Sequence, residues 1–85
     1  MSWTVRNTSS VDRFLEKLDA VTADRIVAKM ETLLKGPYPA GYKKLKGSSN
    51  RYRLRCGDYR ILYEVDAKTG TILTCTVPPR RETYR

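Results

Sequence analysis

The chain has 85 residues, a formal net charge of +8 at pH 7, two cysteines and no histidine. A chain of this length forms one domain with a small core, and without histidine it can build no Ser–His or Cys–His nucleophile and no histidine metal site. No apolar run approaches the roughly 20 residues that span a bilayer, and the N-terminus lacks an apolar signal segment. We therefore expect a cytoplasmic protein without a membrane, metal or small-molecule cofactor.

The N-terminal part predicts a short strand followed by two helices. Residues 3–6 form the strand, and Ser9 or Ser10 caps the first helix. After a break over residues 19–22, Thr22 caps a second helix, which Gly36 and Pro37 end. Apolar residues recur in both helices at helical spacing, namely Val11, Phe14, Leu15, Leu18, Ile26, Val27, Met30, Leu33 and Leu34.

The C-terminal part predicts three strands after a loop over residues 37–41 and a basic segment over residues 42–47. The strands span residues 51–56, 59–65 and 71–77, joined by a tight Gly57-Asp58 hairpin and a longer loop over residues 66–70. Pro78 and Pro79 end the sheet, because proline cannot donate to a strand ladder. The order β-α-α-β-β-β predicts an α+β fold: a small antiparallel sheet with the N-terminal helical hairpin packed on one face.

The two cysteines fall at apolar positions of predicted strands. We interpret Cys56 and Cys75 as buried, reduced thiols of a cytosolic protein. A disulfide between neighbouring strands is the alternative.

Positive charge is concentrated in the second half of the chain. Residues 43–85 hold eleven Lys and Arg against four acids, whereas residues 1–42 hold six against five. Alternation along the strand over residues 51–56 directs Tyr52, Leu54 and Cys56 to the core. The same alternation places a cationic row on the open face, consisting of Arg51, Arg53 and Arg55. Such a row suits a polyanion, with RNA or DNA as the first candidate, and an ordinary solvated sheet face is the alternative.

The last six residues combine three arginines with Tyr84. Arginine grips phosphate and tyrosine stacks on bases, so the segment has the composition of a single-stranded RNA contact. A plain exposed terminus has the same composition, and composition does not choose between them.

Four segments, taken in order, resemble the RelE/ParE toxin superfamily over nearly the whole chain. They are Lys44-Leu45-Lys46-Gly47, Tyr52-Arg53-Leu54-Arg55, the segment from Gly57-Asp58-Tyr59-Arg60 to Val65, and the ending Arg80-Arg81-Glu82-Thr83-Tyr84-Arg85. The family fold, a small antiparallel sheet carrying two N-terminal helices, agrees with the order read above. The resemblance implies a single RelE-like toxin domain over residues 1–85.

The resemblance also implies the toxin of a type II toxin–antitoxin system. RelE-type members cleave mRNA in the ribosomal A site and inhibit translation, whereas ParE-type members act on DNA gyrase. The dense cationic strand and the Arg-Arg-Glu-x-Tyr ending favour the RelE branch, a metal-independent endoribonuclease. Its implied partners are a cognate antitoxin, the ribosome and mRNA. A gyrase inhibitor without nuclease activity, a non-catalytic nucleic-acid-binding domain and a non-toxic family member are the alternatives.

Matching the family pattern residue by residue assigns the site. The implied catalytic residues are Arg60, Arg80, Arg81 and Tyr84, and the implied RNA-binding residues are Lys44, Lys46, Arg51, Arg53, Arg55 and Arg85. Either Arg80 or Arg81 matches the C-terminal arginine of the pattern. The RelE-type pattern has lysine at the positions of Arg53 and Arg55, and arginine stays protonated, so these two can hold phosphate but are poor proton shuttles.

The resemblance also suggests candidates for the general base and for the residues that contact the antitoxin. Tyr84 is expected to act as the base or to stack on a base, with Glu82 as a second candidate for proton transfer. Four apolar helix residues either belong to the core, which is the favoured interpretation, or contact the antitoxin; they are Val11, Leu15, Met30 and Leu34.

Overall fold

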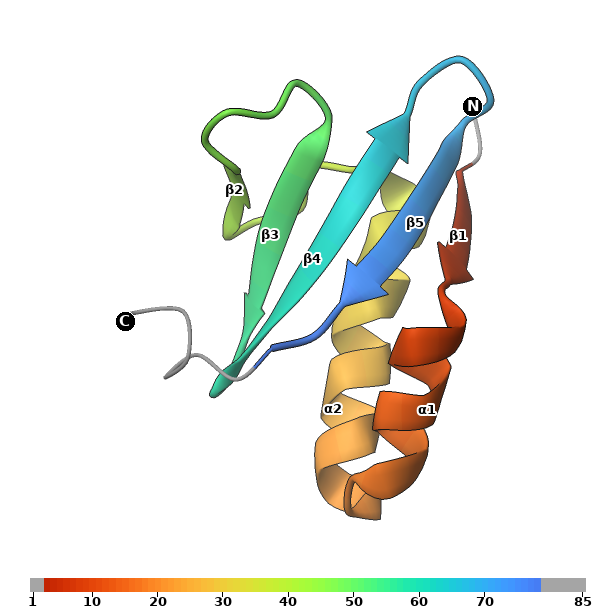
Figure 1. Ribbon diagram of the computed structural model, residues 1–85, viewed down its shortest axis with the longest axis vertical. Helices are drawn as coiled ribbons and strands as arrows, with labels where there is room; N and C mark the ends of the chain where they lie inside the picture. Colours follow the sequence, from red (N-terminus) through yellow and green to blue (C-terminus); the bar gives the residue numbers. More distant parts are fainter. Residues whose placement is uncertain (1–2, 79–85) are drawn as a thin grey trace.

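The computed structural model describes residues 3–78, in which two helices lie behind a five-stranded sheet (Figure 1). The elements are β1 (Thr4–Asn7), α1 (Ser9–Lys17), α2 (Ala20–Glu31), a 3₁₀ turn η1 (Thr32–Lys35), β2 (Tyr42–Lys44), β3 (Arg51–Cys56), β4 (Tyr59–Asp66) and β5 (Thr71–Thr76). The predicted α+β fold with a helical hairpin on one face of the sheet is therefore confirmed. None of these helices is long and apolar enough to cross a membrane.

The strand order is β1-β5-β4-β3-β2, and the sheet is mixed. Strands β2 to β5 form an antiparallel meander, and the sequence predicts its last three strands, β3 to β5. Strand β1 instead pairs parallel to β5, with Thr4 opposite Thr71 and Asn7 opposite Thr74. The alternation of apolar residues defines the faces of a strand but not its direction. The direction of β1 relative to β5 depends on the path of the whole chain between these two strands, which lie at opposite ends of the sequence.

Strand β2 is absent from the elements that the sequence predicts. Its three residues, Tyr42, Lys43 and Lys44, are all exposed, so they show no alternation of buried and polar positions. Lys43 pairs with Arg53, and Lys44 pairs with Tyr52. The short segment is a strand because it pairs with the edge of β3.

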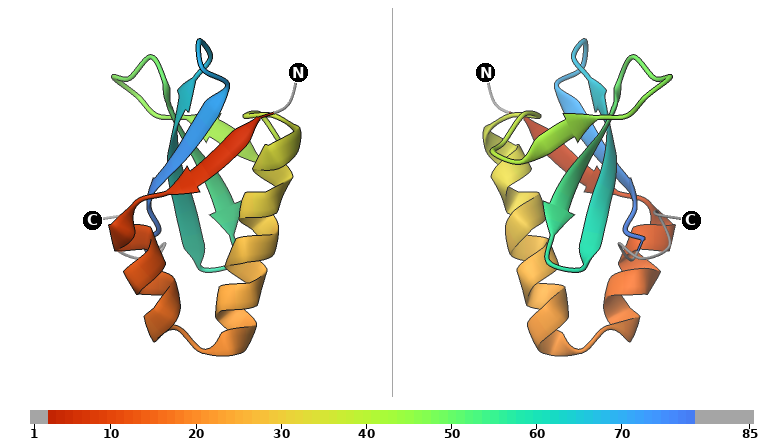
Figure 2. Two further views of the ribbon diagram at one scale, coloured as in Figure 1. Left: turned by 90° about the vertical axis from the view of Figure 1, so that its right-hand side faces the viewer. Right: turned by 90° about the vertical axis from the view of Figure 1, so that its left-hand side faces the viewer.

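Both helices begin earlier than their predicted caps. The hydroxyl of Thr8, not of Ser9 or Ser10, accepts a hydrogen bond from the Val11 amide at 3.3 Å. The Asp19 carboxylate, not Thr22, caps α2 and accepts from the Thr22 amide at 3.0 Å. The predicted break is therefore shorter, and Figure 2 shows the two helices diverging from this tight connection.

The core lies between the helices and one face of the sheet. Tyr52 and Leu54 point into it as predicted, and Cys56 packs against its edge. The buried apolar residues are Val11, Ile26, Met30, Leu33, Tyr52, Leu54, Ile61, Tyr63, Val65, Ile72 and Val77. Of the four helix residues with two possible roles, Val11 and Met30 are core residues, Leu15 is partly buried, and Leu34 is 49% exposed.

Candidate nucleic-acid interface

The sheet face turned away from the helices carries a group of cations, and we call it the open face. Figure 1 looks onto this face. Because side chains alternate along a strand, the face opposite the core residues of β2 to β5 presents Lys43, Arg51, Arg53, Arg55, Arg60, Leu62, Glu64, Leu73 and Cys75. The cationic row predicted on β3 therefore lies on the open face.

Strand register brings cations from three strands together. Arg55 lies directly opposite Arg60, and Arg53 lies between Lys43 of β2 and Leu62 of β4. Directly opposed residues in an antiparallel pair have Cβ atoms about 4.5–5.5 Å apart. These positions gather several cations on one part of the face, and a bound anion is attracted to all of them. The end of the open face next to the β3–β4 hairpin is therefore suited to a phosphate.

Arg60 differs from its neighbours in burial. Arg53 is partly exposed and Arg55 is exposed, whereas Arg60 is only 8% exposed. Its backbone amide donates to the Pro78 carbonyl at 3.1 Å, so the chain that leaves β5 runs beside Arg60. The alternating pattern of β4 predicts which face Arg60 occupies but not that the side chain is buried there.

The opposite end of the open face is closer to neutral. The guanidinium of Arg51 lies 3.8 Å from the Glu64 carboxylate, and the Cys75 thiol donates to the same carboxylate at 3.3 Å. Burial, with the Glu64 carboxylate beside the thiol, raises the pKa of Cys75 to about 11. Because Arg51 is paired with Glu64, it is a weaker ligand for an external anion than Arg53 or Arg55.

The cysteines lie on opposite faces of the sheet, and both are free. Cys56 is on the helix side, where its thiol contacts the Arg25 carbonyl at 3.6 Å. Cys75 is on the open face. Both are half-buried rather than fully buried. Within residues 3–78, no group of three or more His, Cys, Asp or Glu side chains could hold a metal ion.

The remaining predicted site residues fall into two groups. Lys44 and Lys46 are exposed, but Lys44 pairs with Tyr52 and so lies on the helix side of the sheet edge, apart from the open face. Four residues lie outside the described part of the chain: Arg80, Arg81, Tyr84 and Arg85.

A cluster of tyrosines beside Lys44 is a feature that sequence reasoning missed. The ring of Tyr38 lies 5.2 Å from that of Tyr42 and 5.3 Å from that of Tyr52, between centroids. Tyr52 in turn stacks on Tyr63 at 5.8 Å. The segment Pro37-Tyr38-Pro39, followed by Tyr42 and two lysines, was a possible signal, because aromatic residues interleaved with lysine are common at nucleic-acid interfaces.

Comparison with known proteins identifies the class of this molecule. Residues 5–84 match the family described as the ParE toxin of the type II toxin–antitoxin system parDE. The chain belongs to this family and is thus a type II toxin of the RelE/ParE superfamily. No curated protein matches the sequence significantly.

Solved structures share the fold over nearly the full chain. A chain of the archaeal RelE–RelB complex from Pyrococcus horikoshii matches at 29% identity and a TM-score of 0.83, over 94% of this chain and 97% of that chain. A chain of the RelBE2 toxin–antitoxin complex from Mycobacterium tuberculosis matches at 28% identity and a TM-score of 0.79, over 94% and 93%. The isolated RelE toxin of E. coli shares the fold at 20% identity and a TM-score of 0.79, over 96% and 90%.

Proposed function

We propose that this toxin is a metal-independent endoribonuclease that cleaves mRNA in the ribosomal A site and thereby inhibits translation. The observation that supports the proposal is the group formed by Arg53, Arg55 and Arg60 on one sheet face, with Arg55 opposite Arg60. Matches to chains of two RelE-type complexes at 28–29% identity favour the same branch of the superfamily.

The chemistry needs no bound metal, because RNA supplies its own nucleophile, the 2′-hydroxyl next to the scissile phosphate. In-line attack builds negative charge on the phosphorane-like transition state, and preorganised cations stabilise that state more than the ground state. Arg60 is suited to this task, since charges interact more strongly in a partly buried site than in bulk water. Arg53 and Arg55 hold the flanking backbone.

The C-terminal residues complete the proposed site. Arg80 and Arg81 follow Pro78 by two and three residues in the sequence. The Pro78 carbonyl accepts a hydrogen bond from the backbone amide of Arg60. We assign one of these arginines to the transition state and Tyr84 to the proton of the 2′-hydroxyl. Neighbouring guanidinium groups favour the phenolate form of a tyrosine. The products are a 5′-hydroxyl end and a 2′,3′-cyclic phosphate or 3′-phosphate end.

The proposed partners follow from the same charge distribution. A basic face on a small toxin suits an acidic cognate antitoxin, and RelB antitoxins are present in the matched complexes. The ribosome supplies the bent mRNA geometry that a site without a strong base needs. The activity places the single toxin domain, residues 1–85, in the cytoplasm.

A gyrase inhibitor is the second candidate, favoured by the fact that the matching family model describes ParE. In that case the same arginines are protein contacts and no RNA is cut. A domain that binds nucleic acid without cleaving it is the third candidate.

One experiment separates the three functions. The purified toxin is incubated with mRNA in a reconstituted translation system, with naked mRNA, and with gyrase and relaxed plasmid. We expect cleavage on ribosomes, little cleavage of naked mRNA and unchanged supercoiling, and we expect Tyr84→Phe to reduce cleavage while ribosome binding persists. Equal cleavage of naked mRNA contradicts ribosome dependence, and gyrase inhibition without cleavage replaces the proposal with the ParE-type function.

A further inference from the structure

A second surface, at the β2 edge of the molecule, combines exposed aromatic rings with lysines. Tyr38 is 55% exposed and Tyr42 is 42% exposed. Their rings are held in place from below, because both contact Tyr52, which stacks on the buried Tyr63. Tyr63 also fixes the loop, since its hydroxyl donates to the Pro37 carbonyl at 2.5 Å. The exposed rings therefore form a preorganised platform.

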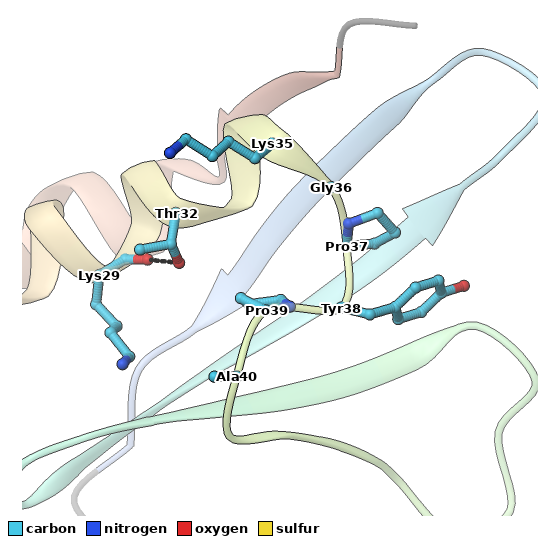
Figure 3. A pocket seen from close by; sticks show the side chains of 8 residues that line it. All are labelled: Lys29, Thr32, Lys35, Gly36, Pro37, Tyr38, Pro39 and Ala40. Atoms are coloured by element: carbon cyan, nitrogen blue, oxygen red, sulfur yellow. Dashed lines mark hydrogen bonds between the residues drawn. The ribbon is translucent and has the colours of Figure 1, made fainter.

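Lysines lie on both sides of the loop that carries Tyr38, with Lys44 next to the rings and Lys29 and Lys35 across the loop from them (Figure 3). A cleft of about 510 Å³ lies between the end of α2 and the loop that carries Tyr38. Figure 3 shows Lys29 and Lys35 on the helix side of the cleft and the loop from Pro37 to Ala40 on the other side. Lys44 lies close enough to Tyr38 to oppose the rise that Tyr52 causes in the pKa of that phenol. The residues that line the cleft include no acid.

We propose that Tyr38 and Tyr42, with Lys29, Lys35 and Lys44, form a second RNA-binding site, which stacks an unpaired base of a single strand on the tyrosine rings while the lysines contact its phosphates. The inference rests on the proposed function and extends it beyond the open face. Strand β2 connects the two surfaces, because Lys43 faces the open face and Lys44 faces the tyrosines. A strand that leaves the arginines can cross this edge.

RNA fits this surface better than a protein partner does. Protein interfaces are depleted of lysine, whereas lysines accompany the tyrosines here, and exposed aliphatic residues lie at another place. Val27 and Leu34 line a separate hollow against β1, together with Val5 and Met30. The tyrosine platform instead offers flat rings and lysine charge. Every base has a π-face, so such a platform binds single strands with little dependence on sequence.

The test uses two labelled octamers that the toxin cannot cleave, both with 2′-O-methyl sugars: one of adenines and one abasic. Fluorescence anisotropy measures the affinity of the full-length protein for each. We expect the adenine octamer to bind more tightly than the abasic one, and we expect Tyr38→Ala to weaken adenine binding about tenfold, the effect of losing one stacked base, without changing abasic binding. Tyr38→Phe retains the ring and should keep the preference.

Controls keep this test separate from the nuclease proposal. Lys35→Ala, which removes a cation that lines the cleft, should weaken the binding of both octamers. Lys17→Ala, at the exposed end of α1, is its matched control and should bind like the wild type. Equal wild-type binding of both octamers, or Tyr38→Ala binding like the wild type, overturns the second site whether or not mRNA is cleaved. If Tyr38→Ala loses binding to poly-glutamate but binds both RNA octamers like the wild type, the surface is assigned to an acidic protein, and the proposed second RNA site is overturned. Absence of ribosomal cleavage with intact base-dependent binding overturns only the nuclease.

Discussion

Arg60 is a cation placed where cations are rarely found. Its side chain is only 8% exposed, and the residue lies opposite Arg55 in the strand register. Like charges directly opposite each other in neighbouring strands lower stability. Natural proteins accept such a cost at functional sites. Arg60 is therefore the single residue on which the proposed catalytic role depends most.

Replacing Arg60 with lysine should reduce ribosome-dependent cleavage by about 100-fold, the effect of removing one preorganised donor from a transition-state site. Lysine keeps the charge but loses the planar fork that binds phosphate bidentately. Cleavage of ribosome-bound mRNA under single-turnover conditions measures the effect. Arg13→Lys, on the exposed side of α1, is the matched control and should cleave like the wild type. An Arg60→Lys protein with at least half of the wild-type rate contradicts the assigned role.

The thiol of Cys75 reports on the electrostatics at the other end of the open face. With a pKa of about 11, roughly one Cys75 in a thousand is thiolate at pH 8, and the fraction rises as pH increases toward 11. Glu64→Gln should lower this pKa and speed alkylation by iodoacetamide roughly two- to tenfold. Peptide mass spectrometry follows each cysteine separately. Cys56, on the other face, is the internal control, and equal acceleration of both thiols would indicate loosening of the fold.

At the scale of elements, the first helix is tied to the sheet through its cap. Thr8 accepts from the Val11 amide, and its hydroxyl donates to the Cys75 carbonyl at 3.0 Å. One side chain thus joins the start of α1 to the end of β5. Neighbouring Ser9 and Ser10 are exposed and offer the same hydroxyl chemistry without this contact, so sequence composition does not distinguish the three.

Thr8→Ala should therefore lower the free energy of unfolding by about 1–2 kcal/mol, through the lost cap and the lost hydrogen bond. Ser9→Ala and Ser10→Ala should each change it by less than about 0.5 kcal/mol. Urea unfolding followed by the fluorescence of Trp3, the one tryptophan of the chain, measures all three. A serine variant that loses as much stability as Thr8→Ala would show that the cap lies at that serine.

At the scale of the whole molecule, the two faces of the sheet have different roles. One face packs the helices and supplies the core, and the other presents Arg53, Arg55 and Arg60. With a net charge of +8, the protein attracts any polyanion at low salt. Specific contact with the open face must therefore be distinguished from this general attraction.

The salt dependence of binding makes that distinction. Each phosphate contact contributes about −0.7 to the slope of log K against log salt for a single strand. We expect Arg53→Ala and Arg55→Ala each to reduce the magnitude of the slope by about 0.7, measured by anisotropy with a 2′-O-methyl octamer. Arg13→Ala, on α1, removes the same charge without touching the open face and should leave the slope unchanged. Equal effects of all three variants would indicate attraction by net charge alone.

The amino-acid sequence by itself determined the elements that depend on local pattern. Strand β3, the hairpin after it and the stop at Gly36 follow from period-two alternation and turn chemistry, which act between residues close in the chain. The same alternation placed Arg51, Arg53 and Arg55 on one face. The family resemblance supplied the class of toxin, which the match over residues 5–84 confirms.

Tertiary structure decided everything that depends on residues distant in sequence. The parallel pairing of β1 with β5, the strand made by Tyr42 to Lys44, the burial of Arg60 beside Pro78 and the separation of Cys56 from Cys75 all arise from which segments meet. The tyrosine platform is the clearest case, because its exposed rings and the two rings that support them come from a loop and three strands. Periodicity describes one segment at a time, whereas a site exists only where packing brings several segments together.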